Sequence, residues 1–158
     1  IFIDRSDNEE TIFLDTFEKS KEYLISNSAG KGFFVSSESL SSSTKSGKKV
    51  MNLKVNDKAI CCSEKQGDSI AVLSGEKKSL KLLVFKHKEI PTLTKGTGVI
   101  LQKFKSGKMV NATCLDSKIG LINKLNGKII LNNKELANWQ GKRAQSGKIQ
   151  PRNILSKL

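Results

Sequence analysis

A repeat of about 50 residues is the feature that most constrains how this 158-residue chain can fold. Short apolar runs recur in the same order three times, so that Val35 matches Val84 and Val72 matches Ile122. The runs are rich in Val, Ile and Phe and are separated by Gly, Ser and Asn, which is typical of β-strands. Three copies of one strand-rich unit predict an all-β, propeller-like architecture.

Each repeat has the same internal order. Three apolar runs are followed by one acidic residue, a basic loop with glycine and a fourth apolar run. The first three runs span residues 11–14, 23–25 and 32–35, then 59–62, 70–73 and 82–85, then 110–114, 120–122 and 128–131. The acidic residues are Glu38, Glu89 and Glu135, which we expect to accept hydrogen bonds from local loop donors. The basic loops span residues 44–49, 94–98 and 143–148.

The fourth run sets the number of strands in each unit. It spans 50–53 and 99–101 and has decayed in the third repeat, where Pro151 disfavours a regular strand. We expect a single domain, residues 1–158, of about three four-stranded blades at roughly 5–53, 54–104 and 105–158. Most propellers have at least four blades, so we expect an open or partial ring. A short helix is predicted near 134–140, where Leu136 and Trp139 share a face.

Positive charge is concentrated in the second half of the chain. Residues 1–79 contain 12 basic and 12 acidic side chains, whereas residues 80–158 contain 16 basic and 3 acidic ones. This asymmetry favours a polyanionic partner, above all a phosphate backbone, because each neutralised phosphate releases counterions. Composition drift in an A+T-rich genome is the alternative, since most of the cations are lysines. Lysine favours point-charge contacts with phosphate over base reading, and few aromatics disfavour single-strand stacking.

The sequence lacks the residue patterns that several classes of function require. No run approaches about 18 apolar residues, as a membrane helix needs. Three cysteines without C-x-x-C spacing and one histidine make neither a zinc cluster nor a disulfide framework. The glycines at 96–98 lack the Lys-Ser/Thr of a nucleotide-binding P-loop. We therefore expect no catalytic, cofactor-binding or metal-binding residue here.

Several single residues and one short segment have structural interpretations instead. We interpret Tyr23 as strand packing, His87 as a solvated loop residue and Trp139 as a hydrophobic plug. Cys61 and Cys62, adjacent on an expected strand, point to opposite faces and are interpreted as structural thiols. The serine-rich segment 36–43 is expected to be a flexible connection.

The glycine-containing segments resemble the C-terminal repeats of bacterial type IIA topoisomerases. The resemblance rests on residues 30–35, 45–52, 88–91 and 95–99, and on the tail 136–147, which resembles the end of the A subunits of topoisomerase IV. It extends from about residue 11 to 154 and implies a β-pinwheel, in which neighbouring blades exchange strands and DNA follows a basic outer rim. The gyrase A subunit is the sister family, and a gyrase-type wrapping domain is the alternative. Its box of glutamine, paired arginines and glycines is not found here.

The resemblance implies a role within a longer protein, and the chain begins at Ile1 rather than Met. In this family, DNA cleavage uses a tyrosine upstream, and ATP hydrolysis with Mg²⁺ takes place on other regions and a separate subunit. The implied parent is an isomerase that relaxes and decatenates DNA, while this part is non-catalytic and has no cofactor of its own. The implied partners are double-stranded DNA, the B subunit of topoisomerase IV and a second A subunit in a heterotetramer. The implied location is the cytoplasm and nucleoid, with peripheral membrane association of the parent left open.

The predicted DNA-contacting side chains come from the basic loops, from the segment after the fourth run of the second repeat, and from the tail. They are expected to gather along one flank of the blades and to position a duplex through its backbone without reading bases. An interaction propeller that docks an acidic protein is a further alternative. The predicted DNA-contacting residues are Lys45, Lys48, Lys49, Lys95, Lys103, Lys105, Lys108, Lys142, Arg143, Lys148 and Arg152.

Overall fold

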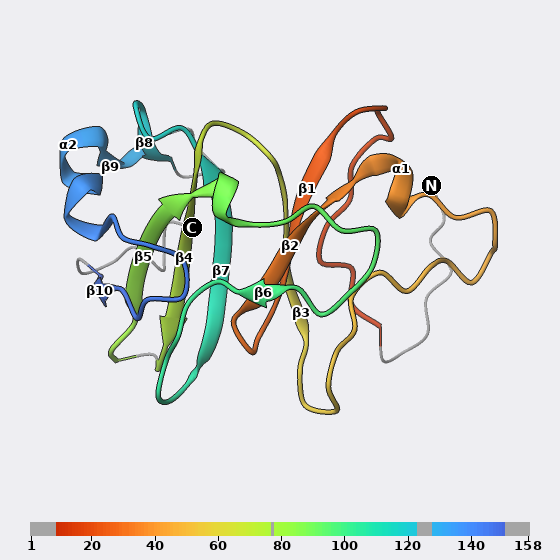
Figure 1. Ribbon diagram of the computed structural model, residues 1–158, viewed down its shortest axis with the longest axis horizontal. Helices are drawn as coiled ribbons and strands as arrows, with labels where there is room; N and C mark the ends of the chain where they lie inside the picture. Colours follow the sequence, from red (N-terminus) through yellow and green to blue (C-terminus); the bar gives the residue numbers. More distant parts are fainter. Residues whose placement is uncertain (1–8, 77, 123–127, 151–158) are drawn as a thin grey trace.

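The computed structural model describes residues 9–76, 78–122 and 128–150, and strands dominate this part of the chain (Figure 1). The strands are β1 (Glu22–Asn27), β2 (Lys31–Ser36), β3 (Ala59–Glu64), β4 (Ser69–Gly75), β5 (Lys81–Lys86), β6 (Val99–Ile100), β7 (Lys108–Leu115), β8 (Gly120–Ile122), β9 (Ile129–Asn132) and β10 (Lys148–Ile149). The helical turns are α1 (Ser37–Leu40), η1 (His87–Glu89), α2 (Asn133–Leu136) and η2 (Ala137–Trp139).

The strands form antiparallel sheets that combine successive repeats. In the first sheet, β1 and β2 of the first repeat form a hairpin, flanked by β3 and β6 of the second repeat. In the second sheet, the hairpin β4–β5 of the second repeat is flanked by β7 and β10 of the third. The hairpin β8–β9 forms a two-stranded sheet in the described residues. This exchange of outer strands between repeats is the arrangement expected of a β-pinwheel.

Two runs that were expected to be strands are not strands in the structure. Residues 11–14 have no regular secondary structure, and within 50–53 only Met51 forms an isolated bridge, to Gly96. Because first and fourth runs pair with the hairpin of the preceding repeat, these two runs need a hairpin ahead of β1. The described residues before β1 contain none. Ile12 and Leu14 are accordingly 44% and 66% exposed.

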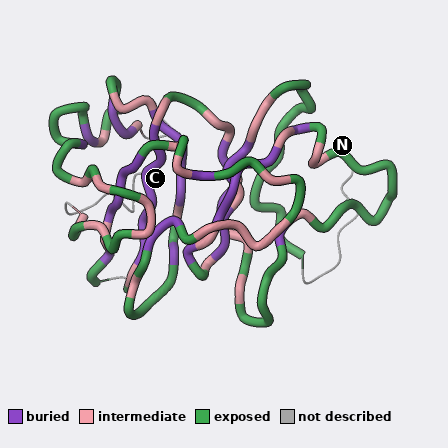
Figure 2. The backbone as a smooth tube through the Cα atoms, viewed as in Figure 1, coloured by how far each residue is buried: buried purple, intermediate pink, exposed green. Residues whose placement is uncertain are grey.

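Two hydrophobic cores lie on the two faces of β4. Ile70 and Val72 of β4 belong to the core between the two four-stranded sheets, together with Phe33 of β2. Ala71 and Leu73 face the other way and pack in a second core with residues of β8, β9 and α2. Successive side chains of a strand point to opposite faces, so a strand covered on both faces reads as a continuous apolar run. Figure 2 shows the buried backbone concentrated in these central strands.

Helical turns follow the third apolar run of every repeat, which is β2, β5 or β9. The short helix predicted near 134–140 is confirmed by α2 and η2. α1 and η1 were not expected, and the serine-rich segment is not simply a flexible connection where α1 begins. There Ser36 Oγ accepts a hydrogen bond from the N–H of Ser39 and caps the helix, as serine commonly does.

The single residues singled out from the sequence are mostly structural. The Tyr23 ring is buried in the first core, as predicted, and its hydroxyl donates to Asp15. The Trp139 indole packs against the second core and donates its N–H to the carbonyl of Ile149 at 3.0 Å. His87 differs from its interpretation as a solvated loop residue, because its ring contacts Phe34 edge-on.

Candidate nucleic-acid interface

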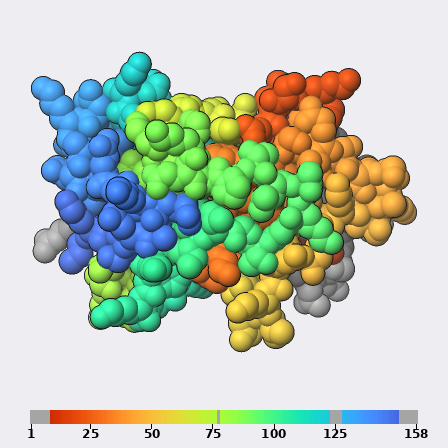
Figure 3. Space-filling model, in the orientation of Figure 1, coloured from red at the N-terminus to blue at the C-terminus, as the bar shows by residue number. Residues whose placement is uncertain are grey.

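The strand ends place a row of lysines at one edge of the molecule. At the lower edge in Figure 1, β1 and β4 end, and β2, β3, β5 and β7 begin. We call this set of side chains the lysine edge. The lysine edge consists of Lys31, Lys54, Lys58, Lys78, Lys81, Lys103, Lys105 and Lys108. The segments at 54–58 and 103–108 project downward in the space-filling view (Figure 3).

The lysine edge is poor in compensating carboxylates. Asp57 and Glu76 are the acidic residues in the described loops of this edge, and the described part of the chain shows no ion pair to any lysine of the set. All of its lysines are exposed except Lys31 and Lys81, which are partly buried. Like charges gathered in this way create a positive potential that attracts a polyanion.

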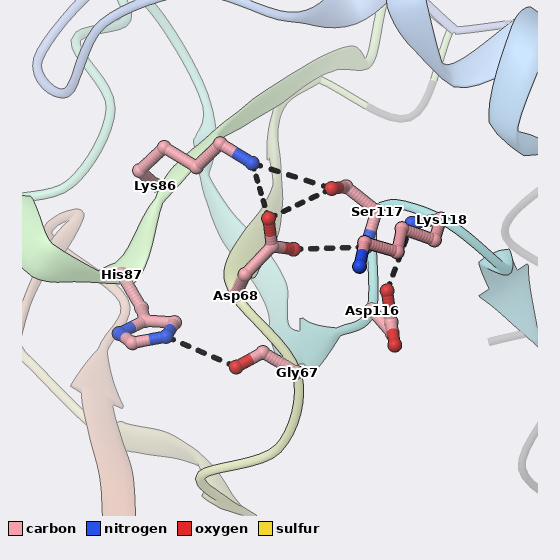
Figure 4. Close-up of polar contacts among 7 residues, drawn as sticks. All are labelled: Gly67, Asp68, Lys86, His87, Asp116, Ser117 and Lys118. Atoms are coloured by element: carbon pink, nitrogen blue, oxygen red, sulfur yellow. Dashed lines mark hydrogen bonds and ion pairs between the residues drawn. The ribbon is translucent and has the colours of Figure 1, made fainter.

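At the opposite edge, several lysines pair with acids of the protein. Figure 4 shows Asp68 accepting hydrogen bonds from Lys86 and from the backbone N–H and hydroxyl of Ser117, the latter two at 2.9 and 2.8 Å. Burial acts to raise the pKa of Asp68, but these hydrogen bonds outweigh it and hold the pKa well below its ordinary value. Similarly, a hydrogen bond from Lys65 lowers the pKa of Glu22. Lys65 and Lys86 of this edge are therefore paired with carboxylates of the protein.

A hollow of about 750 Å³ opens in the lysine edge where the two four-stranded sheets meet. Lys31 and Lys81, the first residues of β2 and β5, line it from the two sheets. Lys103 and Lys105 line it from the segment that connects β6 with β7. Glu76 is the carboxylate in its lining. Sequence reasoning missed Lys31 and Lys81, although they recur 50 residues apart, in step with the repeat.

Glycines hold the predicted basic loops against the sheets. Gly98 and Gly147 have φ values of +77° and +71°, a conformation that residues with a Cβ rarely adopt. A Cβ on Gly98 would lie 2.5 Å from the carbonyl oxygen of Gly32, and one on Gly147 equally close to that of Leu82. The glycines therefore allow the outer strands to approach the sheets. Gly47 has a φ of +75° but open space around it.

The predicted DNA-contacting residues lie in three places rather than along one flank. Lys103, Lys105 and Lys108 belong to the lysine edge. A second group lies on the outer segments that cross the front of Figure 1: Lys95, Lys142, Arg143 and Lys148. A third group lies in the loop between α1 and β3: Lys45, Lys48 and Lys49. Arg152 lies outside the described residues.

Some of these predicted residues also make side-chain contacts within the protein. The Arg143 guanidinium donates to the carbonyl of Ile100 at 2.8 Å, and Lys48 Nζ donates to the carbonyl of Ser39 at 2.9 Å.

The described part of the chain holds no cluster of three or more His, Cys, Asp or Glu side chains suited to a metal ion. It also contains no helix long and apolar enough to cross a membrane.

The repeated acidic residues accept backbone hydrogen bonds. Glu38 accepts from the N–H of Ser20 at 2.8 Å, and Glu135 accepts from that of Asn132 at 2.9 Å. Glu89 accepts from a backbone N–H as well. The expectation of a local donor is confirmed for Glu135, whose donor lies three residues away, but it is wrong for Glu89, whose donor is Arg143 of the third repeat.

Curated relatives and solved structures resemble this chain over most of its length. The A subunit of DNA topoisomerase 4 from Rickettsia conorii is 39% identical over 96% of this chain, and its counterpart from Caulobacter vibrioides is 27% identical over 98%. The chain spans about 20% of the length of these relatives. No protein-family model matches it.

The solved structures are C-terminal domains. The E. coli ParC C-terminal domain aligns with a TM-score of 0.70 at 20% identity, covering 90% of this chain and 59% of that one. The C-terminal domain of DNA gyrase A aligns with a TM-score of 0.62 at 18% identity, covering 87% and 47%. Exchanged outer strands and this likeness define the fold as the β-pinwheel of type IIA topoisomerase C-terminal domains. Within that class, the chain is homologous over 96% of its length to the A subunits of DNA topoisomerase 4, which confirms the resemblance found in the sequence.

Proposed function

We propose that this chain is a duplex-DNA-binding domain of a topoisomerase IV A subunit, where it holds DNA by its phosphate backbone. The observation that carries the proposal is the lysine edge, where exposed ammonium groups gather without carboxylate partners in the described residues. Lysine is a flexible point charge, suited to phosphate but poor at discriminating bases. The homology with topoisomerase IV A subunits supports a DNA partner over an acidic protein.

The role in the whole protein is proposed from the family. The domain would hold a DNA segment so that the cleavage region receives it in the right geometry for relaxation and decatenation. The B subunit, together with a second A subunit, would complete a heterotetramer in the cytoplasm, at the nucleoid. ATP and Mg²⁺ would be used outside this domain. None of these roles requires a catalytic group among the described residues.

A salt titration tests the binding proposal. Fluorescence anisotropy of labelled duplexes of two unrelated sequences would be measured with the 158-residue chain. If six to ten phosphates are engaged, affinity should fall roughly 10³–10⁵-fold between about 50 and 200 mM salt, equally for both sequences. A flat salt response would overturn the proposal. So would displacement of the duplex by an acidic protein at an equal concentration of charge.

A further inference from the structure

The hollow in the lysine edge is held in shape by the sheets. Lys31 pairs with Ile100 of β6, and Lys81 pairs with Ile149 of β10 and Ser74 of β4. Both lysines therefore start from backbone that is fixed by strand pairing rather than from mobile loops. Their side chains approach the same hollow from two different repeats.

The other two lysines of the hollow flank an anchored aromatic residue. Phe104 packs against the first core, with Lys103 and Lys105 on either side. Its ring lies so close to Gly30 that a Cβ on that glycine would be 2.8 Å from the ring edge. The N–H of Lys103 also donates to the carbonyl of Gln145 at 3.1 Å. The backbone that presents these two lysines is therefore fixed at the wall of the hollow.

Two buried polar atoms of the lining lack a hydrogen-bond partner within the described residues. They are Ser74 Oγ and Gln102 Oε1, in side chains of residues that are each 1% exposed. Gln102 Nε2 donates to the carbonyls of Lys81 and Ser146, at 3.2 and 2.9 Å, which fixes the orientation of the amide. Both atoms are closed off from solvent, so they lie behind the surface of the hollow rather than open to a ligand in it.

We propose that this hollow binds the phosphodiester backbone of duplex DNA. The phosphate oxygens would be contacted by Lys31, Lys81, Lys103 and Lys105. The inference rests on the proposed function and goes beyond it, because it assigns the point of contact to the junction between the two sheets. The glycine loops predicted from the sequence then play a supporting part.

Lysine footprinting tests this assignment on the intact chain. The chain would be acetylated with and without a short duplex, with binding followed by anisotropy in the same samples, and lysine reactivity would be read by mass spectrometry. DNA should protect Lys31, Lys81, Lys103 and Lys105 severalfold, while Lys118 and Lys134 react equally in both samples. If the duplex binds but the hollow lysines stay unprotected, the assignment of the DNA contact to the hollow is wrong, and the proposed function stands. If no duplex binds at low salt, the proposed function itself fails.

A pair of matched variants gives a second readout. Lys31→Gln with Lys81→Gln should weaken duplex binding roughly 60-fold at about 0.1 M salt and lower the salt slope by about 2, as expected for two lost phosphate contacts. Lys118→Gln with Lys134→Gln carries the same net charge and should leave both quantities unchanged. Thermal unfolding would confirm that both variants fold. If the first pair does not fold, Lys103→Gln with Lys105→Gln, at exposed positions, replaces it with the same expectation. Equal losses from the hollow pair and the control pair would overturn the assignment.

Discussion

The backbone N–H of Arg143 donates a 2.9 Å hydrogen bond to Oε2 of Glu89, which lies 54 residues earlier in the chain. The guanidinium of the same arginine reaches the carbonyl of Ile100. These bonds attach the tail loop of the third repeat to the second repeat, next to the strand β6. A loop that the sequence predicts to contact DNA thus also connects the third repeat to the second by hydrogen bonds.

Removing this acceptor should weaken the fold more than the binding of DNA. Glu89→Ala leaves the partly buried N–H of Arg143 without its charged partner, and we expect the free energy of unfolding to fall by about 1–2 kcal/mol. Urea denaturation measures the change. Glu76→Ala, at an exposed loop carboxylate, is the control and should change stability by less than about 0.5 kcal/mol. Equal effects of the two substitutions would contradict the role given to Glu89.

The loop glycines should differ in their tolerance of a side chain. Gly147→Ala would place a Cβ 2.5 Å from the carbonyl oxygen of Leu82, so β10 would have to move away from β5. Gly47→Ala carries a similar backbone penalty, since φ is positive at both residues, but meets no neighbouring atom. We expect Gly47→Ala to cost about 1 kcal/mol and Gly147→Ala clearly more. Thermal unfolding of the two variants compares them, and equal costs would show that β10 is not held closely.

The Asp68 cluster predicts how stability depends on pH. Because the pKa of Asp68 is lowered in the folded protein, its carboxylate stabilises the fold above its unfolded pKa of about 3.9. That contribution is lost progressively as the pH falls below about 4. Melting temperatures between about pH 7 and 3 should therefore fall more steeply for the natural protein than for Asp68→Asn. Parallel curves would show that the hydrogen bonds from Lys86 and Ser117 do not stabilise the charged form.

The strands were predictable where both faces are covered. The apolar run of β4 was recognised because Val72 and Leu73 face two different cores, so that residues 70–73 are all apolar. Which strands pair was not predictable from spacing, because a 50-residue period is the same whether β6 completes its own repeat or the preceding one. The resemblance to type IIA topoisomerases supplied that exchange. Residues 11–14 had the composition of a strand, but the described residues contain no hairpin that pairs with them.

The candidate interface was only partly predictable. Lys103, Lys105 and Lys108 were predicted because they follow the fourth run of the second repeat, in the basic half of the chain. Lys31 and Lys81 were missed because a single lysine at the start of a strand is common on any solvent-facing edge. Their importance arises from the packing of two sheets, which brings residues 50 positions apart to one hollow. The pairing of acids with lysines at the opposite edge could not be read from composition either.

The central claim is that affinity for DNA depends on where the lysines lie on the fold, and not simply on the net charge of +13. The most direct measurement compares duplex affinity for two double variants of equal net charge. Lys58→Glu with Lys108→Glu, on the lysine edge, should lower affinity roughly 60-fold or more at about 0.1 M salt. Lys88→Glu with Lys118→Glu, at the opposite edge, should change it less than about threefold, because salt screens distant charges. Equal losses from the two variants would contradict the account.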